Sequence, residues 1–407
     1  MNYRMIALAG LVATGISSTA SEWTEFRGPT GQGHSDVKNL PLKWSATQHV
    51  TWKTPVDSGW SSPVLSDGKI FFTTAKKASD GIGLHAVAVD EKTGRKVWDS
   101  PVLTVAIAKM HKKNSHASPT PIIENGRLYV HFGPNGTACL DLKGKVIWKQ
   151  TSLVYSPQHG NGGSPILVDD KLIFNCDARE DPFIVALDKA TGKVLWKTPR
   201  KSDAKSKFSF STPLLIVVKG QKQVISPGSG VVYALNPDDG KIIWEVFYGQ
   251  GYSVVPRPVY GHGMIYLSTG FNQANVLAIR PDGHGDVTST HVAWKVSRSC
   301  PKTPSLLLVG DELYMVDDSG IASCLNAKSG EIYWSERLEG GGHSASPMSA
   351  GGRIYFQSEA GKTVIVKAGK KFEVLAENDV KEKTYASHAV ADGTIYLRSE
   401  NHLYKIQ

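Results

Sequence analysis

The sequence has no apolar run long enough to cross a bilayer as a helix, which needs about 20 residues. Its one sustained apolar stretch, residues 5–16, is shorter and follows Arg4. Two small residues, Ser18 and Ala20, then offer a cleavage point. This order of features is typical of an export signal. We therefore expect a signal peptide over 1–20 and an exported, soluble protein, periplasmic or secreted, with no transmembrane segment.

Cysteine is scarce. The chain has 4 cysteines among 407 residues, and no two are adjacent. None lies at the end of the expected signal, so an attachment site for a lipid is missing. Their positions in the repeat defined below argue against most disulfide pairings. We predict mostly buried free thiols, which behave as small apolar side chains, at Cys139, Cys176, Cys300 and Cys324.

Helical periodicity and metal-binding patterns are also absent. No 15-residue window repeats apolar residues at the helical spacing, which favours an all-β chain. No carboxylate-rich loop and no short His-x-His or His-x₃-His spacing occurs, so no metal site is expected. No nucleophile-elbow pattern or recognisable catalytic triad is found.

Negative charge is in the minority. Lys and Arg number 46 against 37 Asp and Glu, a formal net charge of +9. The lysines are scattered over turns rather than gathered in one stripe, which is typical of a solvated surface. Together with export, this argues against a nucleic-acid partner.

One repeat recurs along most of the chain. Residues 88–98 read AVDEKTGRKVW, and related strings end at a tryptophan every 40–50 residues. The glycine supplies the positive φ of a tight hairpin, and the tryptophan offers a large flat surface to the neighbouring unit. We therefore predict an architectural docking role for Trp52, Trp98, Trp148, Trp196, Trp244, Trp294 and Trp334.

Each repeat unit reads as four short strands bounded by Gly, Asp and Asn turns. After a lead segment over 21–43, eight such units fill residues 44–407. The last unit has only three strands, and residues 50–56 supply a lone fourth. The sequence thus predicts an all-β, eight-bladed β-propeller of four-stranded blades, whose last blade is closed by the N-terminal strand.

The A-x-D-x-x-T-G-x-x-x-W pattern resembles the tryptophan-docked repeat of the PQQ-like (quinoprotein-type, BamB-like) propeller family. Residues 23–35 and 283–294 resemble a PQQ-binding-like branch of that family without assigned activity. The resemblance implies either a BamB-like envelope protein or an alcohol or sugar dehydrogenase. Such dehydrogenases hold PQQ and Ca²⁺ with a tryptophan floor, often adjacent cysteines, Asp, Asn and Glu ligands, and an Asp base. Because adjacent cysteines and a carboxylate cluster are missing here, we expect no cofactor and disfavour PQQ with calcium.

Segments that lead into the innermost strand of each unit surround the channel on one face of a propeller. Convergent polar groups at such a concavity are the default hypothesis for a site. The predicted ligand-binding residues at this channel mouth are Trp60, His116, His159, Arg257, Lys302, His343 and His388. Arg257 and Lys302 suggest an anionic ligand, whereas the plainer alternative is that the histidines bond to backbone. The insertion at 101–117 is interpreted either as a loop or short helix that contacts a partner or as a tolerated surface excursion.

These observations lead to one functional prediction and two alternatives. We predict an exported, non-catalytic PQQ-like propeller that acts as a binding or scaffold protein in the cell envelope, through a protein partner as BamB-like proteins do or a small anionic or carbohydrate ligand. The first alternative is a PQQ-dependent oxidoreductase with an atypical site. The second is a carbohydrate-binding or polysaccharide-acting propeller, with Trp60, Tyr155 and Tyr252 as starting points.

Overall fold

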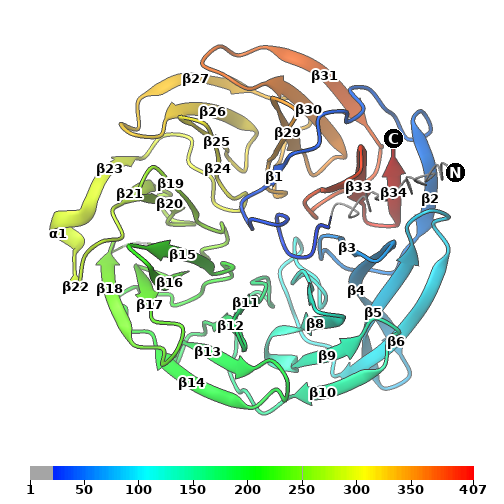
Figure 1. The fold of residues 1–407 in the computed structure, drawn as a ribbon, viewed down its shortest axis with the longest axis horizontal. Helices are drawn as coiled ribbons and strands as arrows, with labels where there is room; N and C mark the ends of the chain where they lie inside the picture. The colour runs from blue at the N-terminus through cyan, green and yellow to red at the C-terminus, as the bar shows by residue number, and fades with distance from the viewer. Residues whose placement is uncertain (1–21, 250) are drawn as a thin grey trace, which may run out of the picture.

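The computed structural model describes residues 22–249 and 251–407. Eight four-stranded antiparallel units are arranged radially around a central axis, as Figure 1 shows. The predicted signal peptide lies outside the described residues.

Blades 1 to 4 follow one another in chain order, and each runs from an inner to an outer strand. Their strands are β3 (Val64–Ser66), β4 (Lys69–Ala78), β5 (Gly81–Asp90) and β6 (Lys96–Val105); β7 (Ile122–Glu124), β8 (Arg127–His131), β9 (Thr137–Asp141) and β10 (Val146–Gln150); β11 (Ile166–Val168), β12 (Lys171–Cys176), β13 (Phe183–Asp188) and β14 (Val194–Pro199); and β15 (Leu214–Val218), β16 (Gln221–Pro227), β17 (Val231–Leu235) and β18 (Ile242–Phe247).

Blades 5 to 8 complete the ring. Their strands are β19 (Val259–Gly261), β20 (Met264–Ser268), β21 (Val276–Ile279) and β23 (Val292–Val296); β24 (Leu307–Val309), β25 (Glu312–Val316), β26 (Ile321–Asn326) and β27 (Ile332–Arg337); β28 (Met348–Ala350), β29 (Arg353–Gln357), β30 (Lys362–Lys367) and β31 (Val374–Asp379); and β32 (Ala389–Ala391), β33 (Thr394–Arg398), β34 (His402–Ile406) and β2 (Val50–Pro55).

The closure of the ring is confirmed. Strand β2 pairs antiparallel with β34, so that the N-terminal strand becomes the outer strand of blade 8. Glu382 strengthens this junction, because its carboxylate accepts hydrogen bonds from Lys53 of β2 and from Tyr404 of β34. The two ends of the propeller are thereby joined within one sheet, and the outer edge of β34 is paired with β2 rather than left open.

Two additions extend the eight blades. A parallel strand, β1 (His34–Ser35), joins β28 of blade 7, and β22 (Gly285–Asp286) joins β18 of blade 4. The described helical segments are a 3₁₀ turn, η1 (Gly133–Asn135), and one turn of helix, α1 (Thr288–His291). No described helix has the length and hydropathy needed to span a membrane.

The repeated glycine and tryptophan meet across the blade boundary. Gly192 of blade 3 has φ +74°, and a Cβ at this position would lie 2.5 Å from the Trp148 ring of blade 2. The Trp148 indole Nε1 donates to the Lys189 carbonyl, in the same turn, at 3.0 Å. The same pattern joins Gly94 to Trp52, Gly144 to Trp98, Gly240 to Trp196 and Gly330 to Trp294. Glycine is therefore required both by the turn and by the indole that packs on it.

Two tryptophans depart from this pattern. Trp334 donates to the Gly369 carbonyl of blade 7 and packs on Phe372. Trp244 is fully buried and donates to the side chain of Gln223 in its own blade. Val287, next to β22, belongs to the same apolar cluster as Trp244. The segment around β22, which belongs to the chain of blade 5 but pairs with blade 4, therefore packs over Trp244. In other blades the tryptophan instead packs on the turn of the next blade.

A belt of hydrogen bonds joins the blades near the axis. The backbone N–H at the start of each inner segment donates to a Ser or Thr hydroxyl of the next blade, at seven of the eight boundaries. At the boundary between blades 4 and 5 the equivalent residue is Arg257, whose Nε donates to the Pro213 carbonyl instead. The small hydroxyl residue that begins most units is thus a structural acceptor, worth about 1 kcal/mol at each boundary.

The lead segment crosses the centre of the ring (Figure 1). Trp23 is buried and bridges Leu65 of blade 1, while Arg27 donates to the Leu306 carbonyl of blade 6 at 2.6 Å. Arg257 of blade 5 donates to Glu25 at 3.0 Å and to the Phe26 carbonyl at 2.7 Å. These contacts attach the lead to blades on several sides of the channel.

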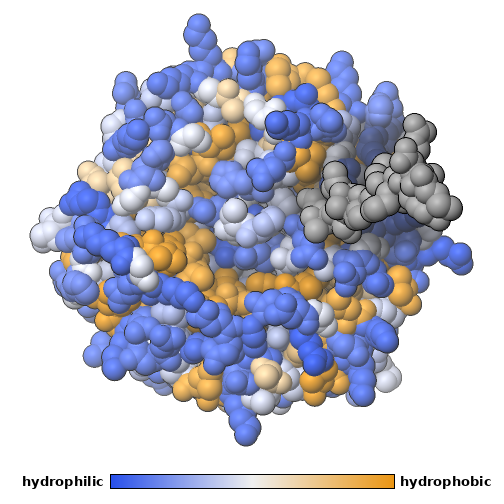
Figure 2. All heavy atoms as spheres, in the orientation of Figure 1, coloured by the Kyte–Doolittle hydropathy of each residue, from blue (hydrophilic) through white to orange (hydrophobic). Residues whose placement is uncertain are grey.

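Apolar packing lies between the blades rather than on one outer face. The described core consists of seven clusters built largely from neighbouring blades. On the face shown in Figure 2, hydrophilic side chains predominate around the rim and hydrophobic ones are scattered. All four cysteines are buried and free, as predicted.

Candidate functional site

A cavity of about 380 Å³ lies at the channel mouth, on the side of the segments that lead into the inner strands. All eight blades and the lead segment contribute to it. Its lining consists of Phe26, Trp60, Ser62, His111, Lys113, Asn114, Ser118, His159, Gly162, Phe210, Thr212, Tyr252, Ser253, Val255, Phe271, Thr303, Ser305, Ser344, Ser346, Tyr385 and Ser387. A cavity of this size is within the range of small-ligand sites, about 300–1,000 Å³.

Aromatic side chains form two walls of the cavity. Trp60 of blade 1 and Tyr385 of blade 8 have ring centroids 4.6 Å apart. Phe210 of blade 4 and Tyr252 of blade 5 belong to blades directly across the eight-membered ring from that pair. The apolar surfaces of the cavity therefore face each other across the channel.

Hydroxyls of the belt form the third element of the lining. Ser62, Thr212 and Ser387 each accept a backbone N–H from the preceding blade. A hydroxyl that accepts one hydrogen bond still has its own proton to donate. The structural belt therefore also offers hydrogen-bond donors to the cavity.

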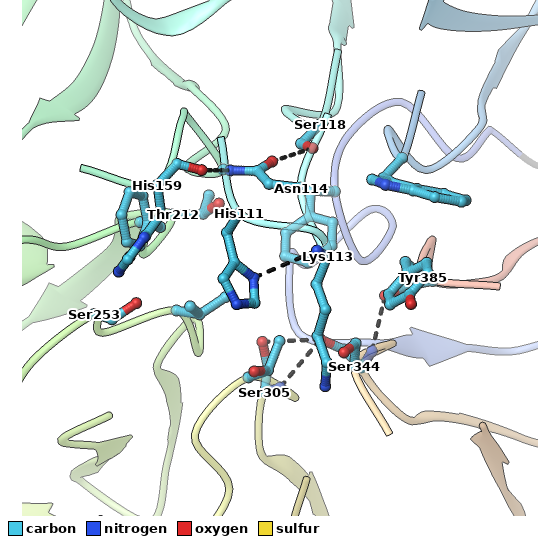
Figure 3. A pocket seen from close by; sticks show the side chains of 18 of the residues that line it. His111, Lys113, Asn114, Ser118, His159, Thr212, Ser253, Ser305, Ser344 and Tyr385 are labelled. Atoms are coloured by element: carbon cyan, nitrogen blue, oxygen red, sulfur yellow. Dashed lines mark hydrogen bonds between the residues drawn. The ribbon is translucent and has the colours of Figure 1, made fainter. Parts of the chain in front are cut away.

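The insertion at 101–117 forms one side of the cavity. Its first residues extend β6 to Val105, so this part of the insertion is strand, and residues 106–117, all of them described, contain no helix. The Asn114 side chain donates to the His159 carbonyl at 2.7 Å and accepts from the Ser118 hydroxyl, as Figure 3 shows. His111, Lys113 and Asn114 all line the cavity. The insertion is thus built into the channel mouth.

The cavity contains little unpaired charge. The Lys113 ammonium lies 2.6 Å from a carboxylate oxygen of Glu359, which also accepts from the Ser344 hydroxyl. The His159 ring bonds to the Tyr252 hydroxyl. Burial, and then the nearby His111 ring, lower the pKa of His159, which favours the neutral ring. The charge of Lys113 is thus balanced by Glu359, which belongs to blade 7.

Two of the seven predicted site residues, Trp60 and His159, line this cavity. The other five lie elsewhere. Arg257 is buried, and its guanidinium is used by Glu25 and the Phe26 carbonyl. The Lys302 ammonium lies 5.3 Å from the centroid of the Phe271 ring, outside the lining. Arg257 therefore presents no free charge to the cavity, whereas the Lys302 ammonium lies behind a ring that lines it.

The three remaining predicted residues are histidines outside the lining. His343 is fully buried, and its Nδ1 lies 2.8 Å from the Gly341 carbonyl oxygen. His388 is also buried, and burial lowers its pKa to about 4. His116 is half-buried, and burial lowers its pKa as well. These rings share a repeat position but do not converge with His159 on one ligand.

The three residues proposed for the carbohydrate alternative also lie partly inside and partly outside the cavity. Tyr252 lines the cavity together with Trp60, but Tyr155 is buried against Phe183, with ring centroids 6.0 Å apart.

Sequence reasoning missed Phe26, Tyr385 and the three residues of the insertion. The unusual length of the segment before the second unit was the signal available for His111, Lys113 and Asn114.

The fold and the cavity define a PQQ-like β-propeller with a ligand-sized cavity at the mouth of its channel. The family model described as outer membrane protein assembly factor BamB matches residues 84–336 and 283–398. The chain belongs to this family.

The similarity to individual relatives is low. An uncharacterized protein of Rickettsia conorii is 22% identical over 244 residues, 57% of this chain and 54% of the relative. The BamB protein of Yersinia pestis is 22% identical over 275 residues, 63% of this chain and 57% of that protein. The match thus spans little more than half the length of these curated relatives.

Solved structures share the fold. BamB from Moraxella catarrhalis aligns with a TM-score of 0.59 at 14% identity, covering 86% of this chain and 99% of that one. A europium-containing methanol dehydrogenase aligns with a TM-score of 0.67 at 13% identity, covering 94% and 90%. At these identities the likeness concerns architecture alone.

Proposed function

We propose that this chain is an exported, non-catalytic binding protein of the cell envelope, which works through a protein partner in outer membrane protein assembly, as its family description indicates. The observation that carries the proposal is the chemistry of the cavity. Its lining has aromatic rings, hydroxyls, an amide, two histidines and one lysine, but no carboxylate and no thiol. This set can bind a ligand through its rings and hydroxyls, but it lacks the carboxylate that orients the histidine of a hydrolase triad.

The two lining histidines are not arranged as in a hydrolase triad. There, a carboxylate orients the ring that serves the nucleophile. Here the His111 Nδ1 accepts the backbone N–H of Lys113, and the His159 Nε2 faces the Tyr252 hydroxyl. Among the described residues neither ring is held by a carboxylate, which supports a binding role.

The cofactor implied by the resemblance is PQQ with Ca²⁺, and the residues present do not fit it. Calcium takes several carboxylate or carbonyl oxygens as ligands. The described part of the chain contains no group of three or more His, Cys, Asp or Glu side chains that could hold a metal ion. The four cysteines lie apart and buried. This mismatch supports the binding role over the quinoprotein alternative.

The segments that carry the lining residues His111 and His159 have exposed residues, here called the rim, that offer positions at which to test for a partner. Ile107 and Val154 are exposed by 74% and 89%, and they lie in the two segments that carry His111 and His159. Val217, exposed by 53%, lies one residue before the end of β15, near the hairpin turn on the other side of the blade, and serves as the matched control. A photoreactive amino acid would be placed at each position in turn in intact cells.

The proposal expects the same envelope protein to be cross-linked from positions 107 and 154 and not from 217. A membership of that protein in the outer membrane assembly machinery would support the finer part of the proposal. No cross-link, or equal yield from all three positions, would refute the rim as the contact surface.

A thermal melt distinguishes the proposed binding protein from the quinoprotein alternative. PQQ and Ca²⁺ at about 100 times the dissociation constant would stabilise a true holoprotein by about 2.7 kcal/mol. We expect the melting temperature to stay unchanged, and a clear upward shift would favour the oxidoreductase alternative.

A further inference from the structure

We infer that the cavity at the channel mouth binds a neutral disaccharide. The inference rests on the proposed function in one respect, namely that the cavity is a binding site and not a catalytic one. It names a ligand for the cavity itself, separate from the protein partner at the rim.

The aromatic walls suit the apolar faces of sugar rings. Trp60 and Tyr385 form a tilted pair with an interplanar angle of 56°, and neither ring is fully buried. Phe210 and Tyr252 stand across the channel. Trp and Tyr combine a broad apolar face with a polar edge, so they can pack against C–H groups while a neighbouring polar group is satisfied.

The polar groups between these walls match neutral hydroxyls. Ser62, Thr212 and Ser387 are fixed by the belt, since each accepts a backbone N–H from the preceding blade. Their protons remain to donate to ligand oxygens. Because each of these hydroxyls is already held by a hydrogen bond of the belt, little conformational entropy is lost when they bind.

The charge of the site argues for a neutral ligand rather than an anion. Lys113 is paired with Glu359 at 2.6 Å, and the guanidinium of Arg257 is used by the lead segment. A ligand carboxylate would have to compete with Glu359 for the one lysine of the lining. A neutral polyol needs no such exchange.

Calorimetric titration of the purified protein would test the inference. The probes are the neutral disaccharides maltose, cellobiose and N,N′-diacetylchitobiose, with a glucuronic-acid disaccharide as the charged comparison. We expect at least one neutral disaccharide to bind with a dissociation constant at or below about 1 mM. Its affinity would not change between low and high salt, because the ligand itself carries no charge.

Three variants locate the ligand. Trp60→Ala removes the aromatic face and weakens binding by about tenfold or more, whereas Trp60→Phe retains a ring and most of the affinity. Tyr155→Phe is the matched control, because Tyr155 is buried close to blade 3 but outside the cavity. We expect it to bind as the unaltered protein does. Circular dichroism and the melting temperature check that each variant is folded.

Several results would overturn the inference. One is the absence of binding by every neutral disaccharide at about 10 mM. Another is equal affinity of folded Trp60→Ala and the unaltered protein. A third is preference for the acidic disaccharide with affinity that falls as salt rises, which would assign the cavity to anions. Failure of the rim cross-link alone would contradict the proposed partner and leave saccharide binding intact, so the two proposals fail separately.

Discussion

Replacing Gly192 by alanine should cost far more stability than the same change at a turn glycine with open space around it. Gly192 has φ +74°, and its new Cβ would lie 2.5 Å from the Trp148 ring. Gly263 is the matched control, since it has φ +67° and a Cβ added there would have nothing within 4 Å. Both variants carry the cost of a left-handed backbone, about 1–2 kcal/mol. Only Gly192→Ala also displaces an indole.

The additional cost at Gly192 has two parts. Moving the Trp148 ring breaks its hydrogen bond to the Lys189 carbonyl, worth about 1 kcal/mol. It also re-exposes part of the roughly 150–250 Å² that a buried tryptophan removes from water, at about 25 cal/mol per Å². If a third of that area is lost, the packing loss is about 1–2 kcal/mol. We therefore expect about 3–5 kcal/mol for Gly192→Ala and about 1–2 kcal/mol for Gly263→Ala.

Denaturant unfolding of both variants measures the difference, and a double-mutant cycle assigns its cause. In a Trp148→Ala background the Cβ of Gly192→Ala meets no indole, so its cost should fall to that of Gly263→Ala. Equal costs of the two glycine variants in the unaltered protein would refute the docking argument. So would a cost of Gly192→Ala that persists after the indole is removed.

Three further predictions concern the belt, the closing blade and the lead. Ser164→Ala removes the acceptor of the buried Thr120 N–H and should lower the free energy of unfolding by about 1–3 kcal/mol. An unchanged free energy of unfolding in denaturant would show that the belt is not stabilising. For Glu382, burial raises its pKa, but hydrogen bonds from Lys53 and its other partners outweigh burial and lower the pKa to about 2 from 4.5. The stability that the ionised Glu382 contributes is therefore fully present above pH 4.5 and is lost as the pH falls toward 2. From pH 6 to 2 the melting temperature should decline more steeply for the unaltered protein than for Glu382→Gln. Parallel curves for the two proteins would contradict this prediction. Arg257→Met leaves the half-buried Glu25 unpaired and should cost about 3 kcal/mol, of which Glu25→Gln in the same chain should restore part. Additive effects of the two changes in denaturant unfolding would refute their coupling.

The fold could be predicted from the sequence because the same pattern of strands and turns recurs in each of the eight units. The spacing of the tryptophans gives the blade length, and the lone strand at 50–56 gives the closure. The repeat could not reveal that glycine is also required by its contact with a tryptophan of the preceding blade. The hairpin alone requires a positive φ, but contact with the indole of the preceding blade depends on how neighbouring blades pack.

The candidate site was predicted less well, because position in a segment does not fix the direction of a side chain. Arg257 stands where other blades have the hydroxyl of the belt, and its side chain therefore turns to the lead segment. His343 and His388 precede inner strands, as expected, yet their rings are buried. The path of the lead across the channel has no counterpart in the repeat, so neither Phe26 nor the partner of Arg257 could be foreseen.

The residues that repeat are largely used by the architecture. The tryptophans and glycines join the outer strands, and the hydroxyls join the inner segments. Most of the specific character of the cavity comes from residues that do not repeat: Trp60, Tyr385, Phe26 and the insertion with Lys113. A relative could therefore keep the whole repeat and bind a different ligand after changes in these few places. For this fold, departures from the repeat are the better guide to what a particular chain binds.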